Sequence, residues 1–142
     1  MWLQLALDCA RATKLASGQR VIDSEWVQIN LARVHAKAEF LKLVNWRIAA
    51  QAGQGLDPAA ASATKVFGSE LATEAYRLLM EVLGANACVP GGSAGAVLVG
   101  RIERLHRSAL ILTFGGGTNE VQPDIIAAAG LGLPPARPLT AG

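Results

Sequence analysis

Two long segments with apolar residues at helical spacing dominate the chain and restrict what it can fold into. In each, apolar side chains recur at steps of three or four residues, which places them on one face of an α-helix. The first segment begins after Asp23 or Ser24, either of which can cap a helix, and runs to about residue 52. The second begins at Asp57-Pro58, where aspartate can cap and proline can take the first helical position, and it ends at Gly84. The two stripes are Val27, Leu31, Val34, Ala38 and Leu41, and Phe67, Leu71, Ala75, Leu78 and Val82.

Shorter helices are expected on both sides of this pair. Residues 1–16 have helical apolar spacing, with no capping residue before them, and they stop at Gly18. A first helix without a cap indicates a domain cut from a longer chain. After a glycine-rich loop, Ser93 can cap a helix that reaches about Ser108, and a last short helix is expected over 118–129.

The composition supports one helical domain. The chain has 142 residues, a single-domain length, and it is 51% hydrophobic but only 5% aromatic, a mixture that favours packed helices over sheets. We therefore predict an all-α fold, an up-down four-helix bundle with a further short C-terminal helix, over residues 1–133. Residues 134–142 are expected to form an irregular tail.

Charge, hydropathy and cysteine usage limit the partners. The net charge is +2 and the basic residues are scattered, so a nucleic-acid role has little support. No run of about 20 apolar residues exists, and no basic region precedes Trp2–Leu7, so we expect a cytoplasmic protein without a membrane span. Cys9 and Cys88 lack metal-binding spacing. One disulfide would be compatible with them, but two buried free thiols are the favoured interpretation.

Two short patterns resemble catalytic motifs, but neither is complete. Glu103 and His106 have the i, i+3 spacing of carboxylate-bridged di-iron bundles, which need two such copies, and the chain has one. We therefore predict no metal site. The segment Gly91-Gly92-Ser93-Ala94-Gly95 matches the Gly-x-Ser-x-Gly nucleophile elbow, but no strand pattern precedes it and no histidine follows His106. A capping turn for the fourth helix is the preferred explanation.

A glycine run stands between the fourth helix and the last one. Gly115, Gly116 and Gly117 let the backbone approach another group closely, and Thr118 can cap the helix that follows. Free N–H groups at a helix start would favour an anion or a phosphate. On this local pattern alone, a plain capping turn explains the run equally well.

The order of these segments resembles the C-terminal all-helical domain of acyl-CoA dehydrogenases, over nearly all of residues 1–133. The most specific match is Gly116-Gly117-Thr118-Asn119-Glu120-Val121-Gln122, where the family commonly has Glu-Gly-Thr-Ser/Asn-Gln/Glu-Ile/Val-Gln-Arg. Leu83-Gly84-Ala85-Asn86-Ala87 corresponds to the family's Leu/Phe-Gly-Gly-x-Gly, and Arg104-Leu105-His106-Arg107 to its Arg-x-x-Arg-Asp.

The resemblance implies a flavoenzyme reaction. Such enzymes desaturate acyl-CoA thioesters between Cα and Cβ: a carboxylate removes the α-proton while a hydride passes from Cβ to FAD. The electrons then leave to an electron-transfer flavoprotein. FAD would lie at a subunit interface, with this domain contacting its ADP half, in a homo- or hetero-oligomer packed through helix faces.

The position of the catalytic base departs from the family pattern. Gly116 stands where the family usually has its glutamate, and glycine cannot accept a proton, so this turn cannot supply the base. The isovaleryl-CoA dehydrogenase branch also lacks this glutamate and places the base on an earlier helix, which here would put it before Met1. Alternatively, the chain is a non-catalytic subunit that pairs with an active partner, as in bacterial heteromeric acyl-CoA dehydrogenases acting on steroid side chains.

The resemblance also implies a set of cofactor-binding positions, several of which carry other residues here. Lys14 replaces an arginine and keeps the charge without the planar fork, and Ser24 lies where the family has phenylalanine. Glu81 replaces a glutamine, so we expect negative charge beside the pyrophosphate to weaken anion binding. The full set is Lys14, Ser24, Glu81, Gly84, Ala85, Gly117, Thr118 and Glu120. We predict that the isolated chain has no dehydrogenase activity.

Overall fold

A computed structural model describes residues 2–51, 53, 55 and 57–134, and its regular elements are all helical. Within these residues the one strand-like feature is an isolated bridge between Lys14 and Arg20. The α-helices are α1 (Trp2–Ala12), α2 (Glu25–Gln51), α3 (Pro58–Leu83), α4 (Arg101–Ala109) and α5 (Gln122–Ile125). Between and after them lie short helical turns at Val21–Asp23, Ala85–Cys88, Val97–Gly100, Leu110–Thr113 and Ile126–Gly130.

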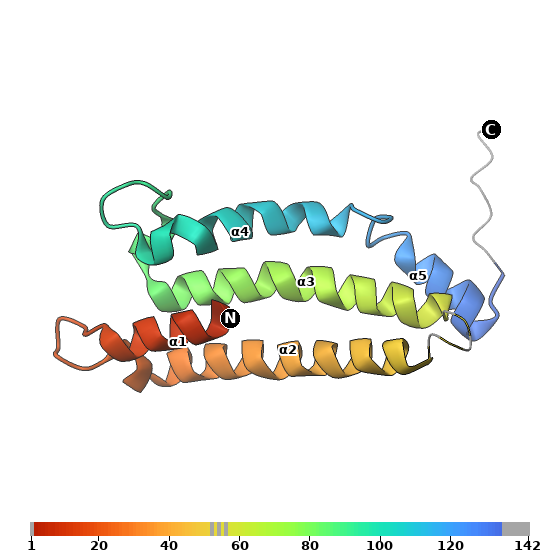
Figure 1. Ribbon diagram of the computed structural model, residues 1–142, viewed down its shortest axis with the longest axis horizontal. Helices are drawn as coiled ribbons and strands as arrows, with labels where there is room; N and C mark the ends of the chain where they lie inside the picture. Colours follow the sequence, from red (N-terminus) through yellow and green to blue (C-terminus); the bar gives the residue numbers. More distant parts are fainter. Residues whose placement is uncertain (1, 52, 54, 56, 135–142) are drawn as a thin grey trace.

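The helices form the predicted up-down bundle. The two long helices, α2 and α3, run antiparallel, with α1 beside one end of the pair and α4 along the opposite side of α3 (Figure 1). Because α3 contacts each of the other four α-helices, it is the central element. The short α5 packs against the other end of α3, where α2 ends. The all-α fold class is therefore confirmed.

Capping chemistry explains where α3 begins and ends. The Asp57 carboxylate accepts a hydrogen bond from the Ala59 amide at 2.9 Å, and Pro58 takes the first helical position, as the sequence predicts. At the other end, Gly84 has a φ of +76°, and its amide donates to the Met80 carbonyl at 3.0 Å.

Asp23, by contrast, does not cap α2. Its carboxylate accepts from the Arg20 guanidinium at 2.7 and 3.0 Å, and this pairing holds the pKa of Asp23 below its usual value. Ser24 contributes its backbone carbonyl, which accepts from the amides of Val27 and Gln28 in the first turn.

Three helix boundaries differ from the prediction. The first helix ends at Ala12 instead of residue 16, because residues 13–20 fold back on themselves: the Val21 amide donates to the Thr13 carbonyl at 3.0 Å. The last helix begins at Gln122, and Thr118 does not cap it through its side chain; its carbonyl accepts from the amides of Val121 and Gln122 instead.

The fourth helix shows the largest difference. It begins at Arg101, eight residues after Ser93, and Ser93 lies in a turn before it and does not cap it. The reason is Gly100, whose left-handed φ of +67° interrupts a regular helix. Gly100 is also packed against the loop: a Cβ there would lie 2.2 Å from the Gly91 nitrogen.

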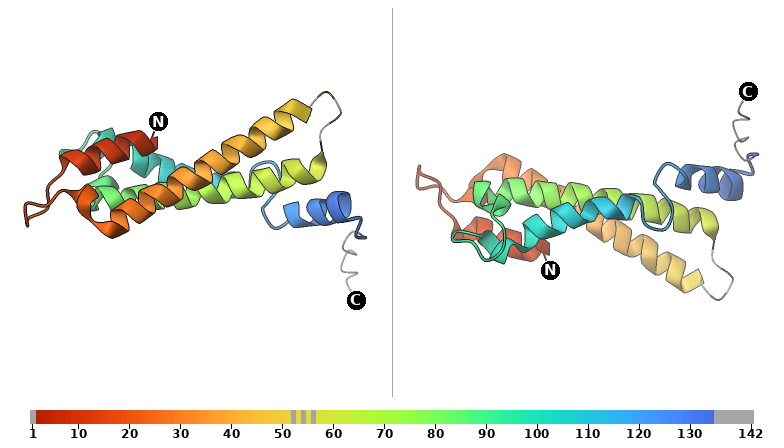
Figure 2. Two further views of the ribbon diagram at one scale, coloured as in Figure 1. Left: turned by 90° about the horizontal axis from the view of Figure 1, so that it is seen from below. Right: turned by 90° about the horizontal axis from the view of Figure 1, so that it is seen from above.

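The core lies where α1, α2, α3 and α4 meet. Val27, Leu31 and Val34 of the first predicted stripe are buried, but Ala38 is exposed. Beyond the core, α2 and α3 diverge toward the end of α2 (Figure 2). Both cysteines are free thiols, as favoured, but the prediction that they are buried is wrong: Cys9 is half-buried and Cys88 is exposed. The buried cluster comprises Ala6, Ala10, Val21, Val27, Leu31, Leu79, Val82 and Ile102.

In the described part of the chain, no helix is both long and apolar enough to cross a bilayer. The predicted tail falls mainly on residues 135–142, which lie outside the described residues.

Candidate functional site

The eight positions that the resemblance assigns to the cofactor fall into two groups along α3. The first group lies where α1, the start of α2 and the end of α3 meet, and the second lies in the turn between α4 and α5 (Figure 1). Lys65 of α3 donates a hydrogen bond to this turn. Lys65 and Glu81 are sixteen residues apart on α3, which corresponds to about 24 Å at 1.5 Å per residue. One chain therefore does not bring both groups to the same phosphate. The first group is Lys14, Ser24, Glu81, Gly84 and Ala85, and the second is Gly117, Thr118 and Glu120.

Three residues of the first group line a cavity of about 300 Å³, whereas Lys14 and Ser24 are not among its lining residues. Glu81, Gly84 and Ala85 line it from the end of α3, while Thr13 and Leu15 line it from the loop after α1. A left-handed backbone makes glycine the suitable residue at position 84, although an added Cβ there would meet no atom within 4 Å. Lys14 belongs to the same loop, and its side chain is exposed.

Glu81 does not present an uncompensated negative charge to this cavity. Its carboxylate forms an ion pair with Arg77, one turn earlier on α3, and accepts a hydrogen bond from Asn30 Nδ2 of α2 at 3.3 Å. Arg77 and Asn30 therefore offset the negative charge of the Glu81 carboxylate within the chain itself. The glutamate that replaces the family's glutamine thus has a structural role in joining α2 to α3, and we expect it to weaken anion binding less than its charge alone indicates.

In the second group, the glycine turn is held by side chains from two helices. Lys65 of α3 donates to the carbonyls of Gly117 at 2.6 Å and of Thr113 at 3.3 Å, and to Asn119 Oδ1 at 2.7 Å. From α5, Gln122 is 4% exposed and its Nε2 donates to the Gly116 carbonyl at 3.0 Å. The turn is therefore a fixed structure that binds through its carbonyls to the bundle.

The sequence interpretation missed Lys65 and its neighbour Ser69, whose hydroxyl accepts from Asn119 Nδ2 at 3.0 Å. A signal for them exists. Ser62, Lys65 and Ser69 recur at steps of three and four, so they form a polar stripe beside the apolar one of α3. Such a stripe on a helix that is covered on several sides indicates internal polar contacts.

Peptide geometry determines which groups of the turn remain available. In a planar trans peptide, the N–H of one residue points away from the C=O of the residue before it, and the chain has no cis peptide in its described part. Because the Gly116 and Gly117 carbonyls point to Gln122 and Lys65, the N–H groups of Gly117 and Thr118 point away from them. Neither N–H has a protein acceptor among the described residues. They form a donor pair suited to an anionic or carbonyl oxygen.

Glu120 is the carboxylate nearest this donor pair in the sequence, and it is held as an anion. Its own backbone N–H, the Thr118 hydroxyl and the charge of Lys65 lower its pKa below the usual value. A carboxylate with a lowered pKa is a weaker proton acceptor, so Glu120 is a poor substitute for the missing base. At Gly116, a left-handed φ of +71° combines with open space, since an added Cβ would meet nothing within 4 Å.

The carboxylate of the incomplete Glu-x-x-His pattern has a structural partner. Glu103 is bound by Arg107 one turn later on α4, with Oε2 accepting from the guanidinium at 3.2 Å. In the part of the chain that the structure describes, no three His, Cys, Asp or Glu residues are grouped to hold a metal.

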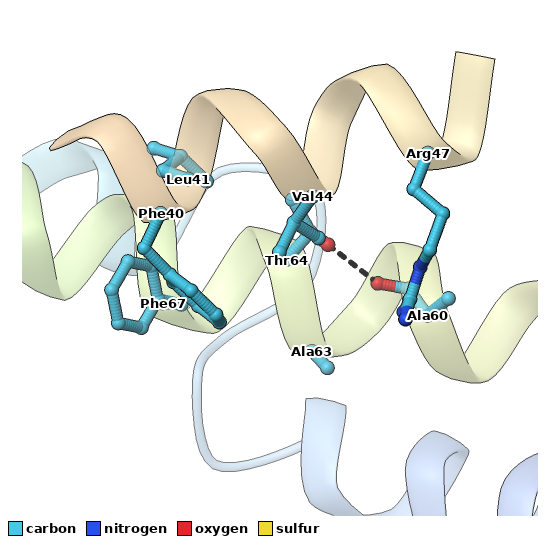
Figure 3. A pocket seen from close by; sticks show the side chains of 8 residues that line it. All are labelled: Phe40, Leu41, Val44, Arg47, Ala60, Ala63, Thr64 and Phe67. Carbon is cyan, nitrogen blue, oxygen red and sulfur yellow. Dashed lines mark hydrogen bonds between the residues drawn. The ribbon is translucent and has the colours of Figure 1, made fainter. Parts of the chain in front are cut away.

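A separate, mainly apolar cavity of about 260 Å³ lies between α2 and α3, in the part where the two helices diverge (Figure 3). Phe40 and Phe67 meet edge-to-face across it, with ring centroids 5.0 Å apart, and Arg47 lies at its far end. The Thr64 hydroxyl donates its hydrogen to the Ala60 carbonyl at 2.7 Å. None of the eight positions assigned to the cofactor lines this cavity.

Comparisons with known proteins agree with this arrangement of helices and turns. Residues 2–131 match the model of the acyl-CoA dehydrogenase C-terminal domain. The chain is 67% identical over 129 residues to the acyl-CoA dehydrogenase FadE26 of Mycobacterium tuberculosis, covering 88% of this chain and 32% of that protein. The structure is similar to a chain of the ChsE4-ChsE5 complex from the same organism, with a TM-score of 0.90 and 65% identity over 96% of this chain and 35% of that one. It is also similar to a chain of the Tcur3481-Tcur3483 steroid ACAD, with a TM-score of 0.83 and 38% identity over 95% of this chain and 35% of that one.

The chain thus belongs to the acyl-CoA dehydrogenase family and corresponds to its C-terminal helical domain. It spans about a third of the length of these relatives.

Proposed function

We propose that this domain completes FAD sites shared between subunits of an acyl-CoA dehydrogenase, and that it does not supply the catalytic base. The observation that carries the proposal is the separation of the two groups by about 24 Å along α3. If both groups contact FAD, they contact different FAD molecules or different parts of one, and the remaining contacts come from another subunit or from other domains. A cofactor at an interface meets this requirement.

Exposed apolar surfaces support association with further protein. Trp26, Phe40 and Trp46 of α2 are between 51% and 61% exposed, and a second exposed set follows α4. Apolar surfaces of this extent on a small chain indicate contacts with other protein. The second set comprises Leu110, Ile111, Leu112 and Phe114. Since two of the similar structures are complexes of differently named chains, we propose a hetero-oligomer.

The residues of the second group fit a flavin nucleotide. Gly117 has a left-handed φ of +91° and a Cβ there would lie 2.7 Å from Gln122 Nε2, so the turn favours glycine at this position. The outward N–H groups of the turn match phosphate or carbonyl oxygens. In this family FAD, when bound, accepts the hydride that leaves Cβ of the acyl-CoA. The N–H groups of Gly117 and Thr118 would bind and orient the flavin nucleotide. Lys14 would add positive charge at the first group of cofactor positions.

We propose two alternative origins for the catalytic base. In the first, the base is a carboxylate outside these 142 residues, because Gly116 has no side chain and Glu120 has a lowered pKa. In the second, the chain is a non-catalytic subunit and the active site lies in its partner. By likeness to the steroid ACAD complex, we propose a steroid side-chain acyl-CoA as the substrate class, with electrons passing to an electron-transfer flavoprotein.

A chimeric complex tests the proposal. This chain would replace the matching third of its counterpart subunit in the ChsE4-ChsE5 complex, to which it is 65% identical, and the purified complex would be examined for flavin absorbance. We expect flavin in the chimera, and no acyl-CoA-dependent dye reduction by the 142-residue chain alone. A folded chimeric complex without flavin, or dye reduction by the chain alone, would contradict it. Changing each candidate carboxylate of the chimera to the amide would then locate the base.

A further inference from the structure

The Lys65 ammonium donates hydrogen bonds to the glycine turn and the residues beside it. This group has three N–H donors, and three acceptors are in place: the carbonyls of Gly117 and Thr113 and the side-chain oxygen of Asn119. All three acceptors are separated from Lys65 by about fifty positions in the sequence, so this one side chain ties the turn to α3. Hydrogen bonds to a charged donor are stronger than neutral ones.

The bond from Lys65 also sets the direction of the turn's donors. It fixes the Gly117 carbonyl toward α3. Because C=O and N–H point in opposite directions within a trans peptide, the Thr118 N–H then points away from Lys65. Gln122 does the same for the Gly116 carbonyl and the Gly117 N–H. Two side chains thus orient two adjacent donors, and Lys65 additionally places a positive charge behind them.

We propose that Lys65 is a positioning residue: it holds the glycine turn in the conformation that presents the Gly117 and Thr118 N–H groups to the bound ligand. This inference rests on the proposed function, because the ligand in question is the flavin nucleotide of the shared site. Lys65 contacts no reacting atom in this account; it acts through the turn. Without its ammonium, the turn retains the bond from Gln122 and the bonds of Asn119 to Ser69 and to the Thr113 carbonyl, and it loses the bond that fixes the Gly117 carbonyl.

The variants should separate positioning from general stability. Lys65→Met keeps the length of the side chain and removes the ammonium, while Lys65→Arg keeps the charge. The matched control is Lys37→Met. It removes a different lysine interaction between helices, the ion pair of Lys37 on α2 with Glu74 on α3, which does not involve the turn. Thermal unfolding of the three variants reports their general stability.

Two measurements test the proposal. The first is ¹⁵N relaxation of residues 115–119 in the 142-residue chain, where we expect order parameters near 0.85 in the parent and in Lys37→Met, and below about 0.6 in Lys65→Met. The second is FAD affinity of the chimeric complex, which should fall at least tenfold in Lys65→Met, less in Lys65→Arg, and not in Lys37→Met. Affinity is obtained by flavin fluorescence titration of the apo-complex.

The outcomes are decisive in each case. A rigid turn in Lys65→Met, or a mobile turn with unchanged FAD affinity, would overturn the positioning role. Equal losses of FAD affinity in Lys65→Met and Lys37→Met would also overturn it, because general destabilisation would then explain both. If the parent chimera binds no FAD, the proposed function fails, and so does the ligand-presenting role of Lys65, while the relaxation data separately decide whether Lys65 holds the turn.

Discussion

Replacing Gly117 with alanine should destabilise the chain more than the same replacement one residue earlier. Gly116 and Gly117 both have left-handed backbones, with φ of +71° and +91°, so each alanine costs about 1–2 kcal/mol in dihedral strain. The two positions differ in their surroundings. A Cβ at Gly117 would lie 2.7 Å from Gln122 Nε2, whereas a Cβ at Gly116 would meet nothing within 4 Å.

The contact at Gly117 forces Gln122 to move. This side chain is 4% exposed and donates to the Gly116 carbonyl at 3.0 Å, and a buried polar group left without its partner costs about 1–3 kcal/mol. Adding the dihedral cost, we expect Gly117→Ala to lower the free energy of unfolding by about 2–5 kcal/mol, and Gly116→Ala by about 1–2 kcal/mol.

Urea denaturation followed by far-UV circular dichroism measures this difference, with an unchanged m-value as the check that only stability has changed. The matched control is Gly117→Ala in a Gln122→Ala background, where the clash partner is gone and only the dihedral cost should remain. Equal destabilisation by Gly116→Ala and Gly117→Ala would refute the role of Gln122. So would a full cost of Gly117→Ala in the Gln122→Ala background.

Two further predictions concern stability. Gly100→Ala should lower the free energy of unfolding by about 3 kcal/mol or more, since it combines dihedral strain with a Cβ 2.2 Å from the Gly91 nitrogen; Gly95→Ala, with a φ of +85° and open space, should cost only about 1–2 kcal/mol in the same urea titration. Because the folded state lowers the pKa of Glu120, the stability that this carboxylate contributes is present at neutral pH and is lost as the pH falls below its usual value of 4.5. Acid titrations should therefore show a shallower loss of stability for Glu120→Gln than for the parent, and identical curves would contradict the assignment.

Local signals explain how much of the fold the sequence predicts. The start of α3 follows from Asp57 and Pro58 alone, and the two long helices follow from their stripes, because these features act within one or two turns. The start of α4 could not be found in this way. It depends on the left-handed Gly100 and on its packing against Gly91, a contact between segments that the sequence does not place together.

The candidate site shows the same division. Its glycines stand out in the sequence because few other residues permit such a turn, but the side chains that hold it lie far away along the chain. Lys65 is about fifty residues from the carbonyls it binds, and Arg77 and Asn30 supply partners for the Glu81 carboxylate that the sequence does not indicate. Partners of this kind follow from tertiary packing, so composition and periodicity do not reveal them.

Flavin binding to the 142-residue chain by itself tests the central claim most directly. The chain, mixed with excess FAD and passed over a gel-filtration column, would be examined for visible flavin absorbance at its own elution volume. Because the two groups of cofactor positions lie about 24 Å apart on one chain, the account predicts a colourless chain that gains flavin only within the chimeric complex. A monomer that elutes with one tightly bound FAD would contradict it, since a complete site would then exist within these residues.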